Sequence, residues 1–425
     1  MNAHCESVSR MLHCWACAAV EPEKWDDWRW QLQQRITQPE ELCRVLGWPA
    51  EVAARMEQVA RKFHMAITPY YLSLARSAAP SDPILRQCVP DPQELEEQDA
   101  TAADPLDEEI DAPVPGLTHR YPDRALFVAT NSCAIFCRHC LRKRNWKNME
   151  ALGSEQATAL MLDYLRRTPA IREVLVSGGD PFLLPEDRLE SLLARLRDIP
   201  HLEVIRIGTR VPVVLPQRVT SELAQMIGRY SPVWVNTHFN HPWELTPEAA
   251  RSVDVLLRAG VPVCNQTVLL RGVNDEAQTM RDLCLGLLKI KVKPYYLFHC
   301  DPVTGTGHFR TSVGRGLAIM ESLRGHISGL AVPVYALDCP GGGGKVPLSP
   351  QFILLQGEGF VIVRNYEGQI VRYDERAGHL TSGITSPGEG LAALLNGDQQ
   401  LLIPEGSLRL RRRLEFGAKS AGSNH

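Results

Sequence analysis

The 425-residue sequence has no apolar run of the roughly 18–20 residues that a membrane-spanning helix requires. It also has no basic excess, because 46 Lys and Arg face 49 Asp and Glu, a net charge of −3. This balance argues against a general binder of nucleic acid or membrane surfaces. Only Arg10 precedes a short apolar stretch broken by His13, which is a poor signal peptide. We therefore expect a globular, cytoplasmic protein without nucleic-acid or membrane partners.

Disulfide scaffolding is also unexpected, because the twelve cysteines are spread thinly over a long chain without a secretory signal. Clustered cysteines in such a chain indicate metal or redox chemistry instead. The N-terminal Cys14-Trp-Ala-Cys17, with Cys5 and His13 nearby, is one candidate, although two cysteines and a histidine do not define a site.

Three changes in composition divide the chain. Helical patterning over residues 25–71 predicts an N-terminal helical region within residues 1–90. From Asp91 to Asp111 there are ten acidic residues and no Lys or Arg, a composition that cannot pack a core, so we expect residues 91–112 to be an exposed acidic linker. A core over residues 113–337 and a C-terminal region over 338–425 complete the predicted organisation.

The core alternates short β-branched runs with amphipathic helical segments, which predicts parallel strands joined by helical crossovers. In residues 185–196 the leucines fall on one face, and Thr246-Pro247 and Gly260 bracket another helix. The predicted strands are 125–130, 173–177, 203–208, 232–236, 261–267, 294–299 and 332–337.

Polar or reactive residues follow the carboxyl end of each of the first six predicted strands. In an α/β barrel these ends converge on one mouth, where active sites are built. A full or partial barrel is therefore favoured over an open sheet. The residues are Cys133, Ser177 to Asp180, Arg210, Asn236 to His241, Asn265-Gln266 and Asp301.

Residues 131–142 (NSCAIFCRHCLR) place Cys133, Cys137 and Cys140 in a CxxxCxxC array directly after a strand. A closed zinc site needs a fourth ligand, and none follows nearby. Three thiolates with an open fourth position suit a [4Fe–4S] cluster that has one iron free for another ligand. The alternative is that the three cysteines are incidental buried residues.

Two glycine-rich segments add to this array. Ser177-Gly178-Gly179-Asp180 lets the backbone approach a ligand closely, or it is an ordinary turn. In DCPGGGGKV (338–346), Lys345 is either a solvated loop residue or a lysine placed to form a Schiff base with pyridoxal 5′-phosphate (PLP).

Together these motifs resemble the lysine 2,3-aminomutase family of PLP-dependent radical S-adenosylmethionine (SAM) enzymes. The resemblance covers most of the chain and includes WDDWRWQ (25–31), LTHRYPDR (117–124), VPVVLPQR (211–218), NTHFNHP (236–242), NQTVLLRGVND (265–275) and GHFRT (307–311). It implies an α/β fold, a partial (β/α)6 barrel of the radical SAM type, with an N-terminal helical region and a C-terminal extension. It also implies an isomerase that uses a [4Fe–4S] cluster, SAM and PLP.

The resemblance assigns a role to each candidate residue. Cys133, Cys137 and Cys140 would hold the cluster, and Lys345 would be the catalytic lysine that carries PLP. PLP would also contact Arg120, Tyr121 and Arg124. SAM would contact His139, Ser177, Gly178, Gly179, Asp180 and Gln266. The substrate would contact Arg142, Asp301 and Asp338. A reductant such as flavodoxin or ferredoxin and a homo-oligomeric state are implied as well.

The two aspartates favour a substrate with a cationic side chain, because a cation relieves the repulsion between neighbouring carboxylates. The resemblance therefore implies interconversion of L-lysine and β-lysine. The same chemistry on L-arginine or on a protein-bound lysine, and a non-catalytic protein that keeps the fold, are alternatives. Zinc, which some members bind, is not expected, because Glu276 replaces one cysteine ligand and no cysteine follows Cys339.

Overall fold

The structure, a computed structural model, describes residues 20–96, 101–147 and 154–375, together with 392, 395–396 and 401–402. The N-terminal candidate cluster of Cys5, His13, Cys14 and Cys17 therefore lies outside the described residues. The chain divides into two compact units. The first comprises Met1–Leu323 and Ile327–Leu348, and the second comprises Arg324–His326 and Ser349–His425.

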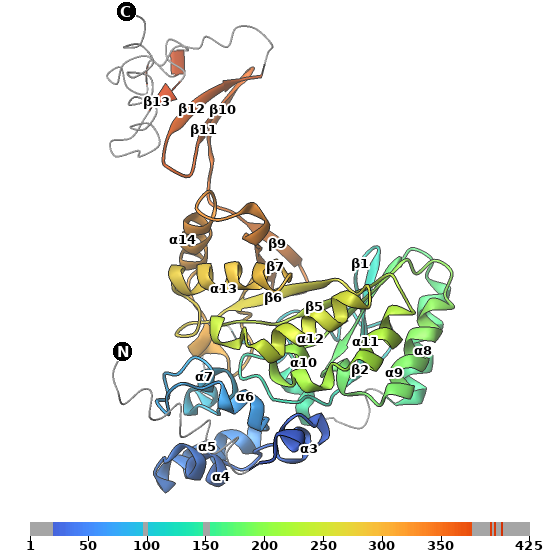
Figure 1. The fold of residues 1–425 in the computed structure, drawn as a ribbon. Coiled ribbons are helices and arrows are strands. Elements are labelled where there is room, and N and C mark those ends of the chain that lie inside the picture. The colour runs from blue at the N-terminus through green and yellow to red at the C-terminus, as the bar shows by residue number, and fades with distance from the viewer. Residues whose placement is uncertain are drawn as a thin grey trace, which may run out of the picture. The chain divides into compact units, whose positions relative to one another are not determined.

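A nine-stranded sheet forms the centre of the first unit, with its strands in chain order (Figure 1). Strands β2 to β8 are parallel, and β1 and β9 add antiparallel edges. The strands are β1 (Leu117–Tyr121), β2 (Arg124–Thr130), β3 (Glu173–Gly178), β4 (Val204–Gly208), β5 (Val233–Thr237), β6 (Val263–Leu269), β7 (Lys293–His299), β8 (Val334–Cys339) and β9 (Gly344–Leu348). All seven predicted strands are confirmed, with small shifts at their ends.

Each of β2 to β7 is followed by at least one helix before the next strand, which confirms the predicted partial (β/α)6 barrel. These helices are α8 (Glu155–Arg167), α9 (Glu186–Arg197), α10 (Val211–Val214), α11 (Ser221–Gly228), α12 (Pro247–Arg258), α13 (Ala277–Lys289) and α14 (Val313–Leu323). The connections between the strands also contain short 3₁₀ turns: η2 (Lys143–Lys147), η3 (Pro181–Leu183), η4 (Pro216–Arg218), η5 (Pro242–Glu244), η6 (Gly307–Phe309) and η7 (Gly329–Ala331).

The local sequence explains where α12 begins and ends and which face α9 buries. Thr246 caps α12 by accepting a hydrogen bond from the backbone N–H of Ala249, and Gly260 follows the helix at φ +77°. In α9, Leu189, Leu192, Leu193 and Leu196 form the buried face. Burying such apolar stripes against the sheet supplies most of the stability of these helices.

The predicted N-terminal helices are present and gather at one end of the barrel (Figure 1). Contacts between α6 and α10 and between α3 and η4 join them to it. Their bounds are α2 (Pro22–Trp25), α3 (Trp28–Gln33), α4 (Pro39–Leu46), α5 (Ala50–Lys62), α6 (Pro69–Ser73), α7 (Leu85–Cys88) and η1 (Pro92–Leu95).

The second unit contains an antiparallel sheet that sequence reasoning did not predict. Its strands are β10 (Ile353–Gly357), β11 (Phe360–Arg364), β12 (Ile370–Asp374) and the short β13 (Leu401–Leu402). Strands β1 and β9 of the first unit were also unpredicted, since 338–346 looked like a glycine-rich loop. Lys345 lies in β9, within the main sheet.

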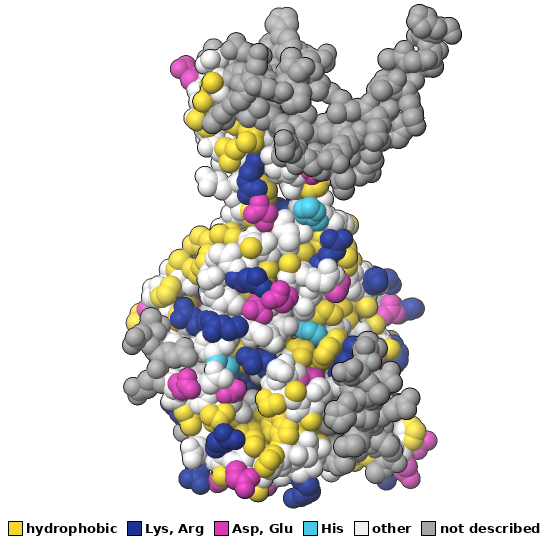
Figure 2. All heavy atoms as spheres, turned by 90° about the vertical axis from the view of Figure 1, so that its left-hand side faces the viewer, with side chains coloured by type: hydrophobic (Ala, Val, Ile, Leu, Met, Phe, Trp, Pro, Cys, Tyr) yellow, Lys and Arg dark blue, Asp and Glu magenta, His cyan; other side chains and the backbone are white. Residues whose placement is uncertain are grey.

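Charged side chains of both signs are interspersed on the face drawn in Figure 2, as the near-neutral composition implies. Among the described residues, every helix is too short or too polar to cross a bilayer.

The expectation that the acidic segment is exposed is wrong for Glu94 and Glu108, which are 0% and 8% exposed. Glu94 accepts hydrogen bonds from Arg138 at 2.6 and 2.8 Å and from Lys143 at 2.7 Å. Both cations belong to the stretch that contains the cysteine array. Burial is possible here because each carboxylate meets a cation that is also withdrawn from water.

Replacing Glu94 by Ala should therefore lower the free energy of unfolding by roughly 3–5 kcal/mol, because Arg138 and Lys143 would stay buried without their carboxylate. Urea-induced unfolding of the variant and the wild type measures the difference. The control is Glu57→Ala, which removes the exposed pair with Arg61 and should cost less than about 1 kcal/mol. Equal stability of the two variants would contradict the prediction.

Candidate active site

One cavity of about 830 Å³ is lined by one face of β2 to β7 and by the loops that follow these strands. Its volume is at the upper end of ordinary ligand pockets. The structure brings every predicted site residue to this cavity: Arg120, Tyr121, Arg124, Cys133, Cys137, His139, Cys140, Arg142, Ser177, Gly178, Gly179, Asp180, Gln266, Asp301, Asp338 and Lys345.

The three cysteines of the array carry free thiols in the loop that follows β2. Burial, followed by the neighbouring thiols, raises the pKa of Cys133 and of Cys140. No group of three or more His, Cys, Asp or Glu among the described residues is arranged around a single metal ion. A cubane cluster does not need that arrangement, because each thiolate binds a different iron. The donor set and its partial burial therefore fit a [4Fe–4S] cluster.

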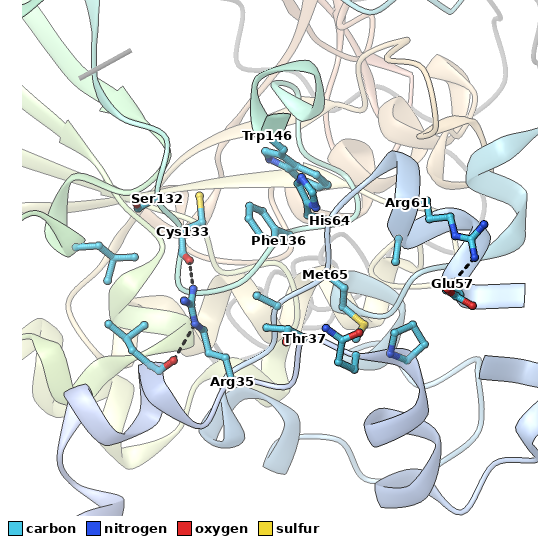
Figure 3. Close-up of a pocket in the computed structure, with 16 residues that line it drawn as sticks. Arg35, Thr37, Glu57, Arg61, His64, Met65, Ser132, Cys133, Phe136 and Trp146 are labelled. Carbon is cyan, nitrogen blue, oxygen red and sulfur yellow. Dashed lines mark hydrogen bonds and ion pairs between the residues drawn. The ribbon is translucent and has the colours of Figure 1, made fainter. Parts of the chain in front are cut away.

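The N-terminal region contacts the backbone of the cysteine loop through Arg35, which lies between α3 and α4. Arg35 donates a hydrogen bond of 2.8 Å to the carbonyl of Cys133 and another of 3.0 Å to that of Leu32. Figure 3 shows these bonds beside a second cavity of about 710 Å³, which Cys133, Phe136 and Trp146 also line. Cys133 thus lies between the two cavities.

At Gly178 and Gly179 the packing of the protein itself leaves no room for a side chain. A Cβ on Gly178 would lie 2.3 Å from the carbonyl oxygen of Thr130, and one on Gly179 would lie 2.4 Å from that of Ser132. The backbone N–H of Gly179 donates a hydrogen bond of 2.5 Å to the carbonyl oxygen of Thr130. The two glycines therefore bring the loop after β3 against the backbone that leads into Cys133.

Asp180 has a structural role that the sequence did not indicate. Its buried carboxylate accepts hydrogen bonds from the Thr209 hydroxyl at 2.6 Å and from the backbone N–H groups of Phe182, Arg210 and Val211 at 2.8–3.2 Å. Burial raises the pKa of Asp180 to about 6, and these donors act in the opposite direction. Asp180 therefore joins the loops after β3 and β4.

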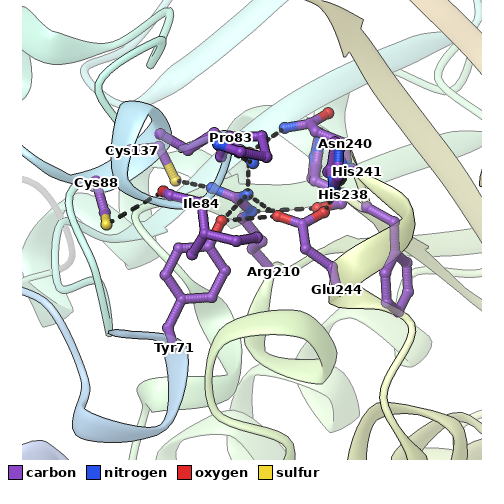
Figure 4. Close-up of polar contacts among 12 residues, drawn as sticks. Tyr71, Pro83, Ile84, Cys88, Cys137, Arg210, His238, Asn240, His241 and Glu244 are labelled. Carbon is purple, nitrogen blue, oxygen red and sulfur yellow. Dashed lines mark hydrogen bonds and ion pairs between the residues drawn. The ribbon is translucent and has the colours of Figure 1, made fainter. Parts of the chain in front are cut away.

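Arg210, at the end of β4, connects the cysteine loop to a buried polar network (Figure 4). It donates to Cys137 Sγ at 2.9 Å, to Glu244 at 2.8 Å and to the Tyr71 hydroxyl at 3.0 Å. Gln87 accepts a further bond at 2.6 Å. Arg210 is predicted from the sequence as a polar residue after a strand. Its hydrogen-bond partners come from distant segments of the chain, so no local pattern indicates them.

Unpaired buried polar atoms mark the part of the cavity next to the cysteines. His139 Nδ1 and Asn236 Nδ2 are buried and have no hydrogen-bond partner among the described residues. Burial and then the charge of Arg210 keep the pKa of His139 well below its usual value, so the ring is neutral. Buried polar atoms of this kind call for a polar ligand, which fits SAM beside the cluster.

Another part of the cavity wall is formed where the two edges of the sheet meet. The backbone N–H of Lys345 in β9 donates a 2.9 Å hydrogen bond to the hydroxyl of Tyr121 in β1. Arg124 stacks on the Tyr121 ring at 4.0 Å, and Arg120 also faces the cavity. An amine beside two guanidinium groups and a phenol fits PLP, whose phosphate needs cationic or hydrogen-bonding partners.

Two aspartates lie close to this amine. Lys345 Nζ is 3.1 Å from Asp338, which is 8% exposed. Burial and then the charge of Asp338 raise the pKa of Asp301 to about 7, while Lys345 acts in the opposite direction. A cationic ligand group near both carboxylates would relieve this repulsion.

Arg142 also faces the cavity, but it has a partner that sequence reasoning missed. Its Nε and Nη2 atoms donate to the two carboxylate oxygens of Glu108 at 3.0 and 2.6 Å. Glu108 was missed because it lies in the segment expected to be an exposed linker.

A cysteine array in the loop after β2 and a lysine in β9 line one cavity of a partial barrel, an arrangement typical of a radical SAM enzyme that carries a carbonyl cofactor. Residues 127–284 match the family model of the radical SAM superfamily, and residues 320–424 match that of lysine-2,3-aminomutase.

Relatives that match most of the chain show which family of radical SAM enzymes it belongs to. The chain is 46% identical over 405 residues to the L-lysine 2,3-aminomutase of Clostridium subterminale, covering 93% of this chain and 97% of that one. It is 42% identical to the enzyme of that name from Bacillus subtilis, with 93% and 86% covered. A glutamate 2,3-aminomutase of Clostridioides difficile is 43% identical, with 83% of each chain covered. The chain belongs to the lysine 2,3-aminomutase family.

The close contact at Gly179 gives a test of how the cysteine loop is positioned. In Gly179→Ala, the added methyl group would displace residues 131–132, which should lower the free energy of unfolding by about 1–3 kcal/mol. It should also lower the iron bound per chain after anaerobic reconstitution. Gly329→Ala, whose Cβ would meet nothing within 4 Å, is the matched control. A G179A protein with wild-type stability and iron content would refute this role.

Proposed function

We propose that the protein interconverts L-lysine and β-lysine by moving the amino group between the α- and β-carbons. The observation that carries the proposal is that one cavity is lined by the cysteine array, Lys345 and the two acidic residues Asp301 and Asp338. The identity to L-lysine 2,3-aminomutases over almost the whole chain supports it.

Different residues of the cavity wall would bind the different cofactors. When bound, the cluster and SAM supply a radical that removes hydrogen, and PLP supplies a carbonyl that holds the substrate amine. Lys345 is the lysine that would carry PLP, with Arg120, Tyr121 and Arg124 around it. Cys133, Cys137 and Cys140 would hold the cluster on the other side.

Substrate choice depends on the charges at the two ends of the amino acid. Arg142 would bind the carboxylate, since a guanidinium matches a carboxylate with two parallel hydrogen bonds. Asp301 and Asp338 would bind the side-chain ammonium. An anionic side chain would add a third carboxylate to this region, which argues against glutamate. L-Arginine and a protein-bound lysine keep the required cation and are the alternative substrates.

Three further properties belong to the proposal. A small electron-transfer protein such as flavodoxin or ferredoxin would reduce the cluster. We also propose a homo-oligomer and a cytoplasmic location, as inferred from the sequence.

The direct test is an anaerobic assay with reconstituted protein, SAM, PLP and a reductant, in which L-lysine, L-arginine and L-glutamate are compared. We expect β-lysine from L-lysine. Turnover of L-glutamate should be at least about 100-fold lower, because a third carboxylate would be buried at a cost of roughly 3–5 kcal/mol. Conversion of arginine without lysine, or of none of the three, would contradict the proposal.

Asp301→Asn tests the ammonium site without removing the partner of Lys345. We expect kcat/KM for lysine to fall on the order of 100-fold, the usual scale for losing one member of a buried charge pair. Reductive cleavage of SAM in the absence of lysine should stay near the wild-type rate. Asp163→Asn, at an exposed carboxylate on α8, is the control. Equal loss of both activities in D301N would show that Asp301 is structural.

A further inference from the structure

Residues 101–113 lie against the cavity instead of crossing solvent. The N–H of Ala102 donates to the carbonyl of Pro302, and the N–H of Gly341 donates to that of Pro105 at 3.1 Å. Arg120 bonds to Asp111 at 2.7 Å and to the carbonyl of Leu106. The segment is thus attached to the loop after β7, to the β8–β9 turn and to β1.

Glu108 is the residue of this segment that reaches the substrate-binding groups. It lines the cavity and binds Arg142 through both carboxylate oxygens. Arg144 donates to the same carboxylate at 3.0 Å, so Glu108 is held by two guanidinium groups. These charges, set against its burial, lower the pKa of Glu108 to about 2, which keeps it ionised at neutral pH.

The geometry of the pair determines what Arg142 can offer to a ligand. A guanidinium has two edges that can bind a carboxylate with parallel hydrogen bonds, one formed by Nε and one Nη, the other by the two Nη atoms. Glu108 occupies the Nε–Nη2 edge. The Nη1–Nη2 edge is the one left for a second carboxylate.

Arg142 needs such a restraint because acidic groups lie in the same cavity. Arg142 and Asp301 both line it, and the charge of Arg142 acts on Asp301. A mobile guanidinium would pair with the nearest available carboxylate, since an unpaired buried charge is costly. If Arg142 paired with Asp301, Arg142 could no longer bind the substrate carboxylate, and Asp301 could no longer bind the substrate ammonium.

We propose that Glu108 is a positioning residue that fixes Arg142 away from Asp301 and presents its Nη1–Nη2 edge to the substrate carboxylate. This inference rests on the proposed function, in which Arg142 binds that carboxylate. The acidic segment then belongs to the machinery of substrate selection.

The test compares L-lysine with L-lysinamide, which lacks the carboxylate charge, by titrating PLP-loaded, cluster-containing protein and following the PLP absorbance. Wild-type protein should bind lysine much more tightly than lysinamide. In Glu108→Gln the ratio of the Kd for lysinamide to the Kd for lysine should fall by about 10–100-fold, which is the usual cost of a binding group displaced by about 1 Å. Glu109→Gln, at the adjacent exposed carboxylate that bonds to Arg144, should keep the wild-type ratio.

A second variant separates positioning from folding. Glu108→Asp keeps the charge on a shorter side chain and should recover part of the discrimination. A wild-type ratio in E108Q protein that retains its cluster and PLP would overturn the proposal. Failure of both E108Q and E108D to hold the cofactors would also overturn it, because Glu108 would then be a folding residue.

The pH dependence of kcat/KM gives a readout that a folding defect would not move. Asp301 is influenced by Asp338, Lys345, Glu108 and Arg142. Loss of the Glu108 charge and a closer Arg142 both favour the ionised form of Asp301, so its pKa should fall. In the plot of kcat/KM against pH, the rise near pH 7 that reports Asp301 should therefore move to lower pH in E108Q and stay in place in E109Q. A rise that does not move in E108Q would contradict the proposal.

The outcomes distinguish this inference from the proposed function. If wild-type protein discriminates lysine from lysinamide but forms no β-lysine, the proposed function fails. If it forms β-lysine and E108Q discriminates as well as wild type, the role of Glu108 fails alone. A wild-type ratio near one contradicts the role of Arg142, and with it this inference.

Discussion

The hydrogen bond between Tyr121 and Lys345 joins the first and last strands of the main sheet, and the cavity depends on this closure. The two residues are 224 positions apart in the sequence. The strands follow each other in chain order, so the twist of the sheet brings its two edges together. As a result, a lysine near the end of the sheet lies beside a tyrosine near its beginning, and both line the same cavity as two arginines and the cysteine loop.

Ion pairs allow acidic and basic side chains to lie together in this cavity. Arg142 is held by Glu108, Lys345 by Asp338 and Arg120 by Asp111, and each pair joins different segments of the chain. Burying a charge is costly unless a partner neutralises it. The acidic segment before the barrel supplies two of these partners, which explains why it is folded against the cavity although its composition is typical of a solvated linker.

Local patterns made much of this architecture predictable. The strands follow from β-branched runs and the cysteine loop from its spacing. The absence of a Cβ at Gly178 and Gly179 predicts a close approach to a ligand, and in the structure the atoms that approach them belong to Thr130 and Ser132. The burial of Glu94 and Glu108 depends on Arg138 and Arg142, to which no local pattern links them. Strand β9 was missed because a four-glycine run suggests a loop; in the structure Gly341, Gly342 and Gly344 adopt positive φ angles around the turn between β8 and β9.

Nuclear relaxation of the PLP phosphorus shows whether the cysteine array and Lys345 face each other across one cavity. PLP would be fixed to the protein with borohydride, the modified lysine identified by peptide mapping, and the relaxation of the PLP phosphorus compared with the cluster oxidised and reduced. We expect a label on Lys345 and strongly enhanced relaxation of the phosphorus when the cluster is paramagnetic. A label on another lysine, or relaxation that does not depend on the state of the cluster, would contradict it.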